Sequence, residues 1–561
     1  ARGLKIRRHD GNVMTYRDTV RSHFVTSLGT AQTVAETRRK LLEEVYDYQV
    51  TAIAEGSRER VRSDIVPAQR DQAAADKMAG LLVQQGVEVS RATSTFGACG
   101  NRYAAGSYVI NLDQPRKRMV RTLLDQDVPM ADDWMQEQER RRGKNLPHQI
   151  YDVTGWALPL MMNVQTDSCD RTVEGALEAA GPELVLPGTV SGGEGKVAYL
   201  VPWGTAASVR LAANALREGL SVKSSDLAFT HDGRRYPAGT LILSAADNPE
   251  TLGETLAELA ESTGADVIAV DDSWVTDGPN FGSDNVVRVP APRVAILWDE
   301  PTSSYSAGNT RFVIERQFDY PVTAIRVSTL KRGDLARFNV LIVPESWGGY
   351  AGAIGEPVVA KLKDWVSRGG VLIGLGAANR WLADPKVDLL AIRREDAVVE
   401  KDDESKSNGK SNGGGKGDEP AEATVPGTVV TSREEYEDLI RADKAAPDPV
   451  PGVLVRADVD PDHWLGAGVA PQLNVLAQGR DIYTPIRYDK GVNVAMYTQA
   501  DELVASGYMW EENRKQLAYK PFAVVQPTGQ GFVIAFTQDP NYRAYLCLLY
   551  TSDAADDDYT V

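Results

Sequence analysis

A direct internal repeat constrains the fold of this chain more than any other feature of its sequence. QGVEVS at 85–90 is followed by YAAGSYVI at 103–110, and EGLSVK at 218–223 is followed by YPAGTLIL at 236–243. Both blocks of the first copy recur 133 residues later, as the glycines at 86 and 219 and the tyrosines at 103 and 236 show. A shared spacing without a gap indicates that one folding unit has been duplicated.

Each copy predicts the same order of elements. An amphipathic helix (71–85 in the first copy, 205–218 in the second) ends at a glycine, and a strand, a loop, the Tyr-x-Ala-Gly motif, a second strand and another helix follow. We therefore expect two small α/β units, over 57–165 and 166–289. The motif glycine should adopt a backbone conformation that other residues reach only at a cost. A tight turn accounts for the motif, and ligand binding by it stays an alternative.

A different pattern begins at residue 290. Short apolar runs alternate with helical segments, which predicts a parallel sheet covered on both faces, and therefore a doubly wound, flavodoxin-like α/β domain over 290–545. The expected strands are 294–298, 322–327, 340–343 and 371–374, the expected helices are 310–318, 358–366 and 432–442, and further strands are expected at 493–497, 522–526 and 532–536. The stretch 401–418 has no aliphatic or aromatic residue, so we expect a flexible, disordered insertion.

One turn of this third domain resembles the nucleophile elbow of the class I glutamine amidotransferase-like fold. In VLIGLGAA (371–378), Gly376 stands where that family has its cysteine, and no Ser, Thr or Cys lies in the turn. The loop PESWGG (344–349) resembles the oxyanion-side loop of the same family. A fold without its nucleophile implies a domain kept for structure or binding. An amidohydrolase that uses Ser346 is a weaker alternative, because no histidine is close in sequence to act as its base.

Charge and hydropathy exclude two classes of partner. The chain has 78 acidic and 61 basic residues and a net charge of −17, which disfavours binding to nucleic acid. The basic cluster Arg140–Arg142 is interpreted as a solvated helix face. No run approaches the roughly 20 apolar residues of a membrane span, and the first residues have no apolar signal-peptide core.

The sequence contains no recognisable metal or redox motif. None of the five histidines, at 9, 23, 148, 231 and 463, has zinc-ligand spacing. His148 and His231 lie in polar, loop-like stretches, and His463 follows a turn. The three cysteines form no C-x-x-C pair, although Cys99 and Cys169 could form a disulfide. We therefore predict no catalytic, cofactor-binding or metal-binding residue in this chain.

Residues 15–56 predict two helices with apolar stripes, separated by Gly29 and Thr30. The first stripe is Tyr16, Val20, Phe24 and Leu28, and the second is Val34, Leu41, Val45, Tyr48 and Ala52. We interpret these stripes as surfaces that pack against a further body of protein.

Several longer blocks resemble the region downstream of the catalytic domain in large bacterial zinc carboxypeptidases of the carboxypeptidase A type. They are YRDTVRSHFVTSL (16–28), YAAGSYVINLDQPRKRMVRTLLDQDVPM (103–130), QIYDVTGWALPLMMNV (149–164), SGYMWEENRKQLAYKPFAVV (506–525) and DPNYRAY (539–545). That family holds zinc with an H-x-x-E pair and a later His and activates water with a Glu. None of these residues is present here, whereas Ala1–Gly3 look like the strand that follows the catalytic Glu.

The resemblance implies that the chain is the C-terminal accessory part of a zinc metallocarboxypeptidase-like protein. Residues 1–56 would be the last helices of its catalytic domain, and zinc and the peptide or protein substrate would belong to the intact parent. A periplasmic or extracellular location follows from the resemblance alone. The tail 546–561 resembles translated adapter sequence and is interpreted as non-native. The alternative is a non-catalytic peptide- or sugar-binding protein, and whether this chain alone is an enzyme is left open.

Overall fold

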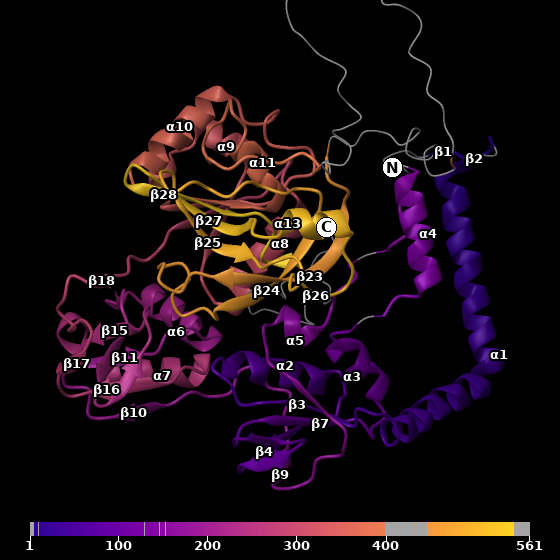
Figure 1. Cartoon of the computed structure of the whole chain (residues 1–561), viewed down its shortest axis with the longest axis horizontal. Helices are drawn as coiled ribbons and strands as arrows, with labels where there is room; N and C mark the ends of the chain where they lie inside the picture. The colour runs from indigo at the N-terminus through magenta and orange to yellow at the C-terminus, as the bar shows by residue number, and fades with distance from the viewer. Residues whose placement is uncertain are drawn as a thin grey trace, which may run out of the picture. The chain divides into compact units, whose positions relative to one another are not determined.

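The computed structural model describes residues 5–8, 11–127, 129–144, 146–151, 153–398, 432 and 446–542 (Figure 1). The chain forms two compact units: Ala1–Pro67, Leu82–Thr122 and Thr166–Ala180 make the first, and Ala68–Leu81, Leu123–Gln165 and Gly181–Val561 make the second. None of the described helices combines the length and the apolar character needed to cross a membrane. The predicted flexible insertion, nearly all of the helix expected at 432–442, and the predicted non-native tail lie outside the described residues.

The first unit contains a long helix and a small antiparallel sheet. Its sheet has the strand order β8-β3-β7-β4-β9, and β5 and β6 form a separate hairpin. The elements are β1 (Lys5–Arg7), β2 (Val13–Thr15), α1 (Tyr16–Gly56), β3 (Ser63–Val66), β4 (Ser90–Ala92), β5 (Phe96–Ala98), β6 (Asn101–Tyr103), β7 (Tyr108–Asn111), α3 (Lys117–Leu124), β8 (Asp167–Cys169) and β9 (Leu177–Ala179).

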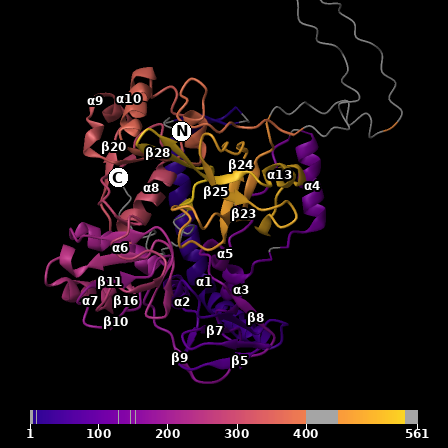
Figure 2. The same cartoon turned by 60° about the vertical axis from the view of Figure 1, so that its left-hand side comes forward.

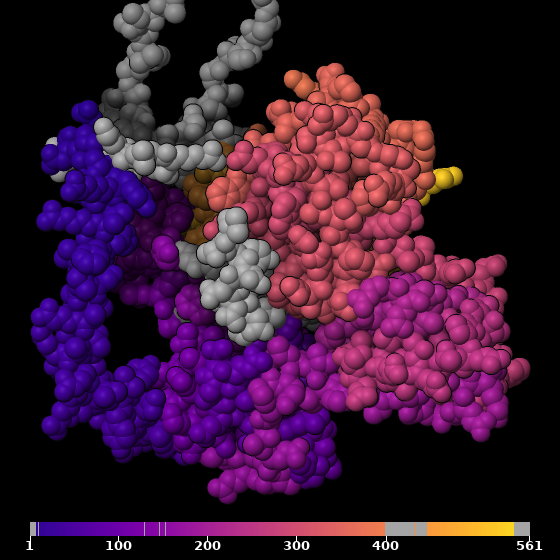
Figure 3. Space-filling model, turned by 180° about the vertical axis from the view of Figure 1, so that it is seen from behind, coloured from indigo at the N-terminus to yellow at the C-terminus, as the bar shows by residue number. Residues whose placement is uncertain are grey.

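Helix α1 is one continuous helix, so the prediction of two helices was wrong. It begins with a capping box in which the Thr15 hydroxyl accepts from the Asp18 N–H and the Asp18 carboxylate accepts from the Thr15 N–H. Gly29 does not end it, because one interior glycine costs only about 1 kcal/mol relative to alanine, and 41 residues supply many compensating bonds. Both apolar stripes are largely exposed in this structure, and Figure 3 shows one face of this helix in indigo.

The second unit begins with a region that holds the other copy of the repeat. Its six-stranded sheet has the order β10-β16-β11-β15-β12-β18, and a smaller sheet has the order β14-β13-β17. The elements are α2 (Gln72–Gln84, which runs into the first unit), α4 (Asp132–Gly143), α5 (Leu158–Met161), β10 (Val190–Gly192), β11 (Ala198–Val201), α6 (Ala206–Arg217), β12 (Lys223–Ser225), β13 (Phe229–His231), β14 (Arg234–Tyr236), β15 (Leu241–Ser244), η1 (Ala245–Asp247), α7 (Leu252–Thr263), β16 (Val267–Val270), β17 (Val275–Asp277) and β18 (Val286–Arg288).

The predicted duplication is confirmed by strand order. The order β8-β3-β7-β4-β9 in the first copy matches β16-β11-β15-β12-β18 in the second, and every neighbouring pair is antiparallel in both. Equivalent hairpins pair Phe96 with Tyr103 and Phe229 with Tyr236, and their rings stack with centroids 5.2 and 5.1 Å apart. The two copies therefore share one chain path.

The last region of the second unit forms a single mixed sheet (Figure 2). Its elements are β19 (Val294–Leu297), α8 (Ser304–Phe312), η2 (Val313–Gln317, a π-helix), β20 (Val322–Ile325), α9 (Val327–Arg332), η3 (Leu335–Arg337), β21 (Val340–Val343), α10 (Glu356–Ser367), β22 (Val371–Leu375), η4 (Gly376–Ala378), α11 (Asn379–Leu382), β23 (Val450–Val459), β24 (Gln472–Gly479), β25 (Val492–Tyr497), β26 (Val504–Ser506), α13 (Glu511–Leu517), β27 (Pro521–Thr528) and β28 (Gly531–Phe536).

Half of this sheet is doubly wound, as predicted. Strands β20-β19-β21-β22-β28 are parallel and follow the 2-1-3-4-5 order of flavodoxin-like folds. The sheet then continues in antiparallel order, because β28 also pairs antiparallel with β27, and β25, β23 and β24 follow. A tight turn joins β27 to β28, and such a turn connects antiparallel strands only.

Both faces of the parallel half are buried, which explains its nearly unbroken apolar strands. In β19, Ala295 and Leu297 pack in a cluster with residues of α9, α10 and α11. Val294 and Ile296 pack on the opposite face with Ala307 of α8. Because successive side chains of a strand point to opposite faces, a strand covered on both sides needs apolar residues at every position.

The two Tyr-x-Ala-Gly turns predict unequal costs for the same substitution. Gly106 and Gly239 have φ values of 88° and 86°, so alanine at either site is strained by about 1 kcal/mol or more. A Cβ at Gly239 would also collide with the Trp203 ring, whereas one at Gly106 would meet only the Arg91 guanidinium, at 3.9 Å. We expect Gly239→Ala to lower the free energy of unfolding by at least about 1 kcal/mol more than Gly106→Ala in urea titrations. Equal losses would contradict the packing argument.

Candidate functional site

A polar cavity opens at the carboxyl ends of the parallel strands. In doubly wound folds ligands bind at this edge, near the point where the strand order reverses. The loops after β21, β22 and β28 all contribute to the cavity, whose volume is about 500 Å³. Its lining consists of His148, Ile150, Val153, Glu345, Ala377, Arg380, Val450, Pro451, Gln478, Gly479, Arg480, Asp481, Thr537, Gln538 and Tyr542.

The elbow predicted after β22 has the backbone of a nucleophile elbow and no side chain. Gly376 has a φ of 47° between the strand and the short helices η4 and α11. A Cβ built on Gly376 would collide with the carboxylate of Glu345. That carboxylate accepts a hydrogen bond from the backbone N–H of Ala377, the residue that follows the elbow glycine. The space that a nucleophile would need is therefore filled by an acid from the neighbouring loop.

The environment of Glu345 favours its protonated form. Burial raises the pKa of this carboxyl to about 7, and the nearby charges of Asp539 and Asp481 act in the same direction. Asp539 is 5% exposed, and burial also raises the pKa of its carboxyl. Asp481 is paired with the Arg380 guanidinium. Near neutral pH the Glu345 carboxyl can therefore donate a hydrogen bond to a ligand.

Hydrogen bonds fix the loop that presents Glu345. Its backbone N–H donates to the Ser306 hydroxyl at 3.1 Å, and its carbonyl accepts from the Ser303 N–H at 2.7 Å. The Ser306 side chain also bonds to the Asp539 carboxylate. The elbow is tied to β28 in turn, since the Asn379 amide donates to the Phe536 carbonyl at 2.7 Å. The site is thus largely preformed.

The cavity lining includes both apolar and polar side chains. The apolar lining residues come from two segments. Ile150 and Val153 lie before β19 in the chain, and Val450 and Pro451 begin β23. The polar lining side chains include two carboxylates, two amides and two guanidinium groups. They are Glu345 and Asp481, Gln478 and Gln538, and Arg380 and Arg480. Such a lining provides hydrogen-bond donors and acceptors in nearly equal measure.

His148, His231 and His463 lie in three different surroundings. His148 lines the cavity, and its ring lies 6.0 Å from the Trp510 ring. His463 follows a turn, as predicted, and its Nδ1 accepts from the Leu465 N–H. The loop expected around His231 was wrong, because this residue is the last of β13 and is 1% exposed. The hairpin to β14 places it there, a pairing that a polar sequence does not reveal.

Two groups of potential metal ligands are brought together in the described part of the chain, and neither was predicted. One consists of Cys99, Cys169 and Asp170, and the other of His231, Asp232 and Asp272. In the second group the carboxylates flank opposite ring nitrogens, with Asp272 3.3 Å from Nε2 and Asp232 3.7 Å from Nδ1. A metal ion binds one of the two ring nitrogens, whereas these two carboxylates lie beside different nitrogens. The arrangement therefore suits a hydrogen-bonded histidine better than a three-ligand metal site.

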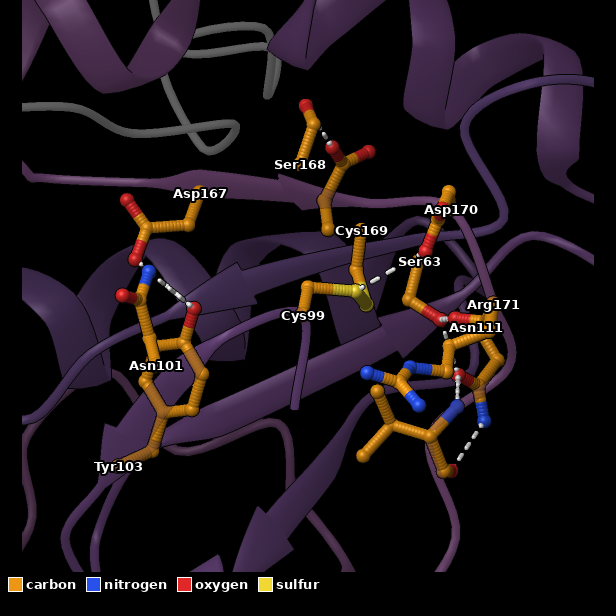
Figure 4. The surroundings of a disulfide bond; sticks show 12 residues. Ser63, Cys99, Asn101, Tyr103, Asn111, Asp167, Ser168, Cys169, Asp170 and Arg171 are labelled. Atoms are coloured by element: carbon orange, nitrogen blue, oxygen red, sulfur yellow. Dashed lines mark hydrogen bonds between the residues drawn. A yellow bond between two sulfur atoms is a disulfide. The ribbon is translucent and has the colours of Figure 1, made fainter. Parts of the chain in front are cut away.

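The disulfide that the sequence left open is present. Cys99 and Cys169 are bonded, with their Cα atoms 5.6 Å apart, and join the β5–β6 hairpin to β8 (Figure 4). The Tyr103 hydroxyl on the same hairpin donates to the Asp167 carboxylate at 3.0 Å. Because both sulfurs are committed to each other, the cysteine group cannot serve as a thiolate metal site.

Ser346 does not acquire the partners of a nucleophile. Its backbone forms an isolated antiparallel bridge with Thr302, and its side chain is not part of the cavity lining. Within the described residues, no hydrogen bond links it to a histidine. The geometry therefore gives no support to the amidohydrolase alternative.

Comparisons with known proteins give distant structural likenesses. No family model and no curated protein matches the sequence. Among solved structures, a ThuA-like protein from Parabacteroides merdae is 12% identical, with 44% of this chain and 79% of that chain covered and a TM-score of 0.27. A glutamine amidotransferase from Thermotoga maritima is 8% identical, with 44% and 74% covered and a TM-score of 0.25.

A β-galactosidase from Bacillus circulans sp. alkalophilus is 12% identical at a TM-score of 0.23, and the match covers 44% of this chain and 28% of the enzyme. The matched part thus spans less than a third of that enzyme's length. Neither activity nor ligand is transferred at these scores. The sheet defines the structural class of the protein. It is a mixed α/β protein with a flavodoxin-like parallel half and an elbow that has no nucleophile.

The raised pKa of Glu345 predicts a pH dependence of stability. The native state holds this proton more tightly than the unfolded chain between the ordinary value of 4.5 and about 7, so stability falls as pH rises through that window. Glu345→Gln keeps an acceptor for Ala377 and cannot ionise. We expect the variant to gain about 1–3 kcal/mol relative to wild type between pH 5 and pH 8, measured by urea unfolding. The exposed Glu356→Gln on α10 is the control, and an unchanged pH profile in Glu345→Gln would contradict the assignment.

Proposed function

We propose that the doubly wound domain is a non-catalytic sugar-binding domain, and that the cavity at the carboxyl edge of its sheet is the binding site. The observation that carries the proposal is the amphipathic cavity beside an elbow whose nucleophile position is filled by Glu345. With no side chain at Gly376 to attack a bond, the remaining groups are suited to hydrogen bonding.

The lining of the cavity matches the chemistry of a sugar ring. A pyranose has an apolar C–H face and a rim of hydroxyl groups, each of which donates and accepts hydrogen bonds. Planar carboxylate, amide and guanidinium groups can each form hydrogen bonds with two neighbouring hydroxyl groups. Glu345, Gln478 and Arg480 provide one group of each kind. The aliphatic lining side chains of Ile150, Val153 and Val450 offer apolar surface to the C–H face. The volume of about 500 Å³ lies within the usual range of small-molecule sites.

Calorimetry with glucose, galactose, mannose and N-acetylglucosamine tests the proposal. Arg480 is exposed and lines the cavity, so Arg480→Ala should remove a charged hydrogen-bond donor without unfolding the domain. We expect it to weaken binding of the recognised sugar by about 1.5–3 kcal/mol, which is roughly 10- to 150-fold. Arg487→Ala, at an 86% exposed arginine outside the cavity lining, is the matched control.

Binding of none of these sugars, or equal affinity of the Arg480 variant and the control, would refute the proposal. Binding of a peptide in the same cavity, displaced by no sugar, would replace the ligand class. Release of product from glutamine or from a glycoside by the wild-type chain would refute the non-catalytic assignment.

The parent protein is a separate part of the proposal. We propose that this sugar-binding region belongs to a zinc metallocarboxypeptidase-like protein located outside the cytoplasm. The support is the resemblance of the long sequence blocks, such as 149–164, together with the Cys99–Cys169 disulfide, because disulfides persist mainly in oxidising compartments.

This second part predicts how zinc behaves. The purified chain 1–561 should hold no stoichiometric zinc and release no C-terminal amino acids, because the H-x-x-E motif is absent from its sequence. Fusion to an upstream catalytic segment carrying H-x-x-E should restore both properties. Metal analysis that finds one tightly held zinc per unfused chain would contradict the prediction and direct attention to His231, Asp232 and Asp272.

A further inference from the structure

Two large aromatic side chains stand exposed at the same edge of the sheet as the cavity. Tyr305 is the second residue of α8, which follows β19, and Trp347 lies in the loop after β21. They are 71% and 75% exposed. Their rings are nearly parallel, with an interplanar angle of 13° and centroids 6.0 Å apart. Two stacked rings left in water form an apolar shelf that the flat face of a ligand can cover.

The shelf is held by rigid backbone. The Trp347 N–H donates to the Pro301 carbonyl at 3.2 Å, and Thr302 bridges to Ser346 beside it. The Ser303 hydroxyl caps α8 by accepting from the Ser306 N–H, directly around Tyr305. Both loops are thus bonded to each other and to the ends of their strands. Little backbone conformational entropy therefore remains to be lost when a ligand binds.

Glycines leave room around the rings. Gly348 and Gly349 follow Trp347, and Gly308 lies one turn after Tyr305 on the same face of α8. A Cβ built at any of these three positions would meet no atom within 4 Å. No neighbouring side chain of the described structure therefore occupies the space next to these positions.

We infer that Tyr305 and Trp347 form a second sugar subsite, on which a pyranose ring of an oligosaccharide stacks while another ring occupies the cavity. The C–H face of a pyranose is apolar and slightly positive, and aromatic faces are electron-rich, so the two surfaces attract and also bury apolar area. Trp347 is two residues from Glu345, which lines the cavity, so one loop serves both places. The inference rests on the proposed function for its ligand class and extends it from a monosaccharide to a chain of sugars.

The test compares short and long sugars on the full chain. Cellohexaose, mannohexaose and chitohexaose are titrated by calorimetry and by tryptophan fluorescence, together with their monosaccharides. Trp347→Ala and Tyr305→Ala should each weaken the recognised hexaose at least tenfold and leave monosaccharide affinity unchanged. Trp347→Phe keeps a ring and should retain most of the affinity. Trp274→Ala, at a tryptophan of the same 75% exposure elsewhere in the second unit, is the control. Melting temperatures establish that each variant is folded.

The outcomes separate the two assignments. Hexaose binding lost in Arg480→Ala and unaffected in both aromatic variants would overturn the shelf and retain the cavity. Binding lost in the aromatic variants and unaffected by Arg480→Ala would retain the shelf and overturn the cavity. Absence of binding to every hexaose, or Trp347-dependent binding of a proline-rich peptide instead, would overturn the shelf as a sugar site.

Discussion

The parallel pairing of β22 with β28 is the contact on which the rest of the second unit's last domain depends. Five residues of β22 are in register with β28, from Val371 opposite Phe532 to Leu375 opposite Phe536. This pairing links the first four parallel strands to β28, and through β28 to the antiparallel strands β27, β25 and β23. It also brings the loops after the two strands to one edge, where Gly376 and Asp539 meet Glu345.

Much of the fold could be predicted because its signals are local. The duplicated unit was recognisable from glycines and tyrosines at fixed spacing, and the backbone at Gly106 and Gly239 shows why those glycines are required. The strands of the parallel half are apolar at nearly every position because both faces are covered. The extent of α1 was not predictable from Gly29. Helix formation is cooperative, so one residue of low helix propensity does not end a long helix.

The site was predictable only in part. The sequence alone shows that position 376 is a glycine. The positive φ of Gly376 agrees with the interpretation of this turn as an elbow without a nucleophile. Glu345 carries no sequence signal of its role, because its raised pKa arises from burial and from two acids that lie 136 and 194 residues further along the chain. The aromatic shelf was missed for a similar reason, since Tyr305 and Trp347 become neighbours only when two strands pair.

The contact between Glu345 and the elbow glycine makes the two positions epistatic. A side chain introduced at 376 would collide with the carboxylate, and shortening residue 345 alone would leave a gap beside an unpaired Ala377 N–H. Each single change is costly, whereas the pair made together is sterically compatible. Introduction of a nucleophile at position 376 therefore requires a coordinated double substitution, because either single substitution gives a less stable domain.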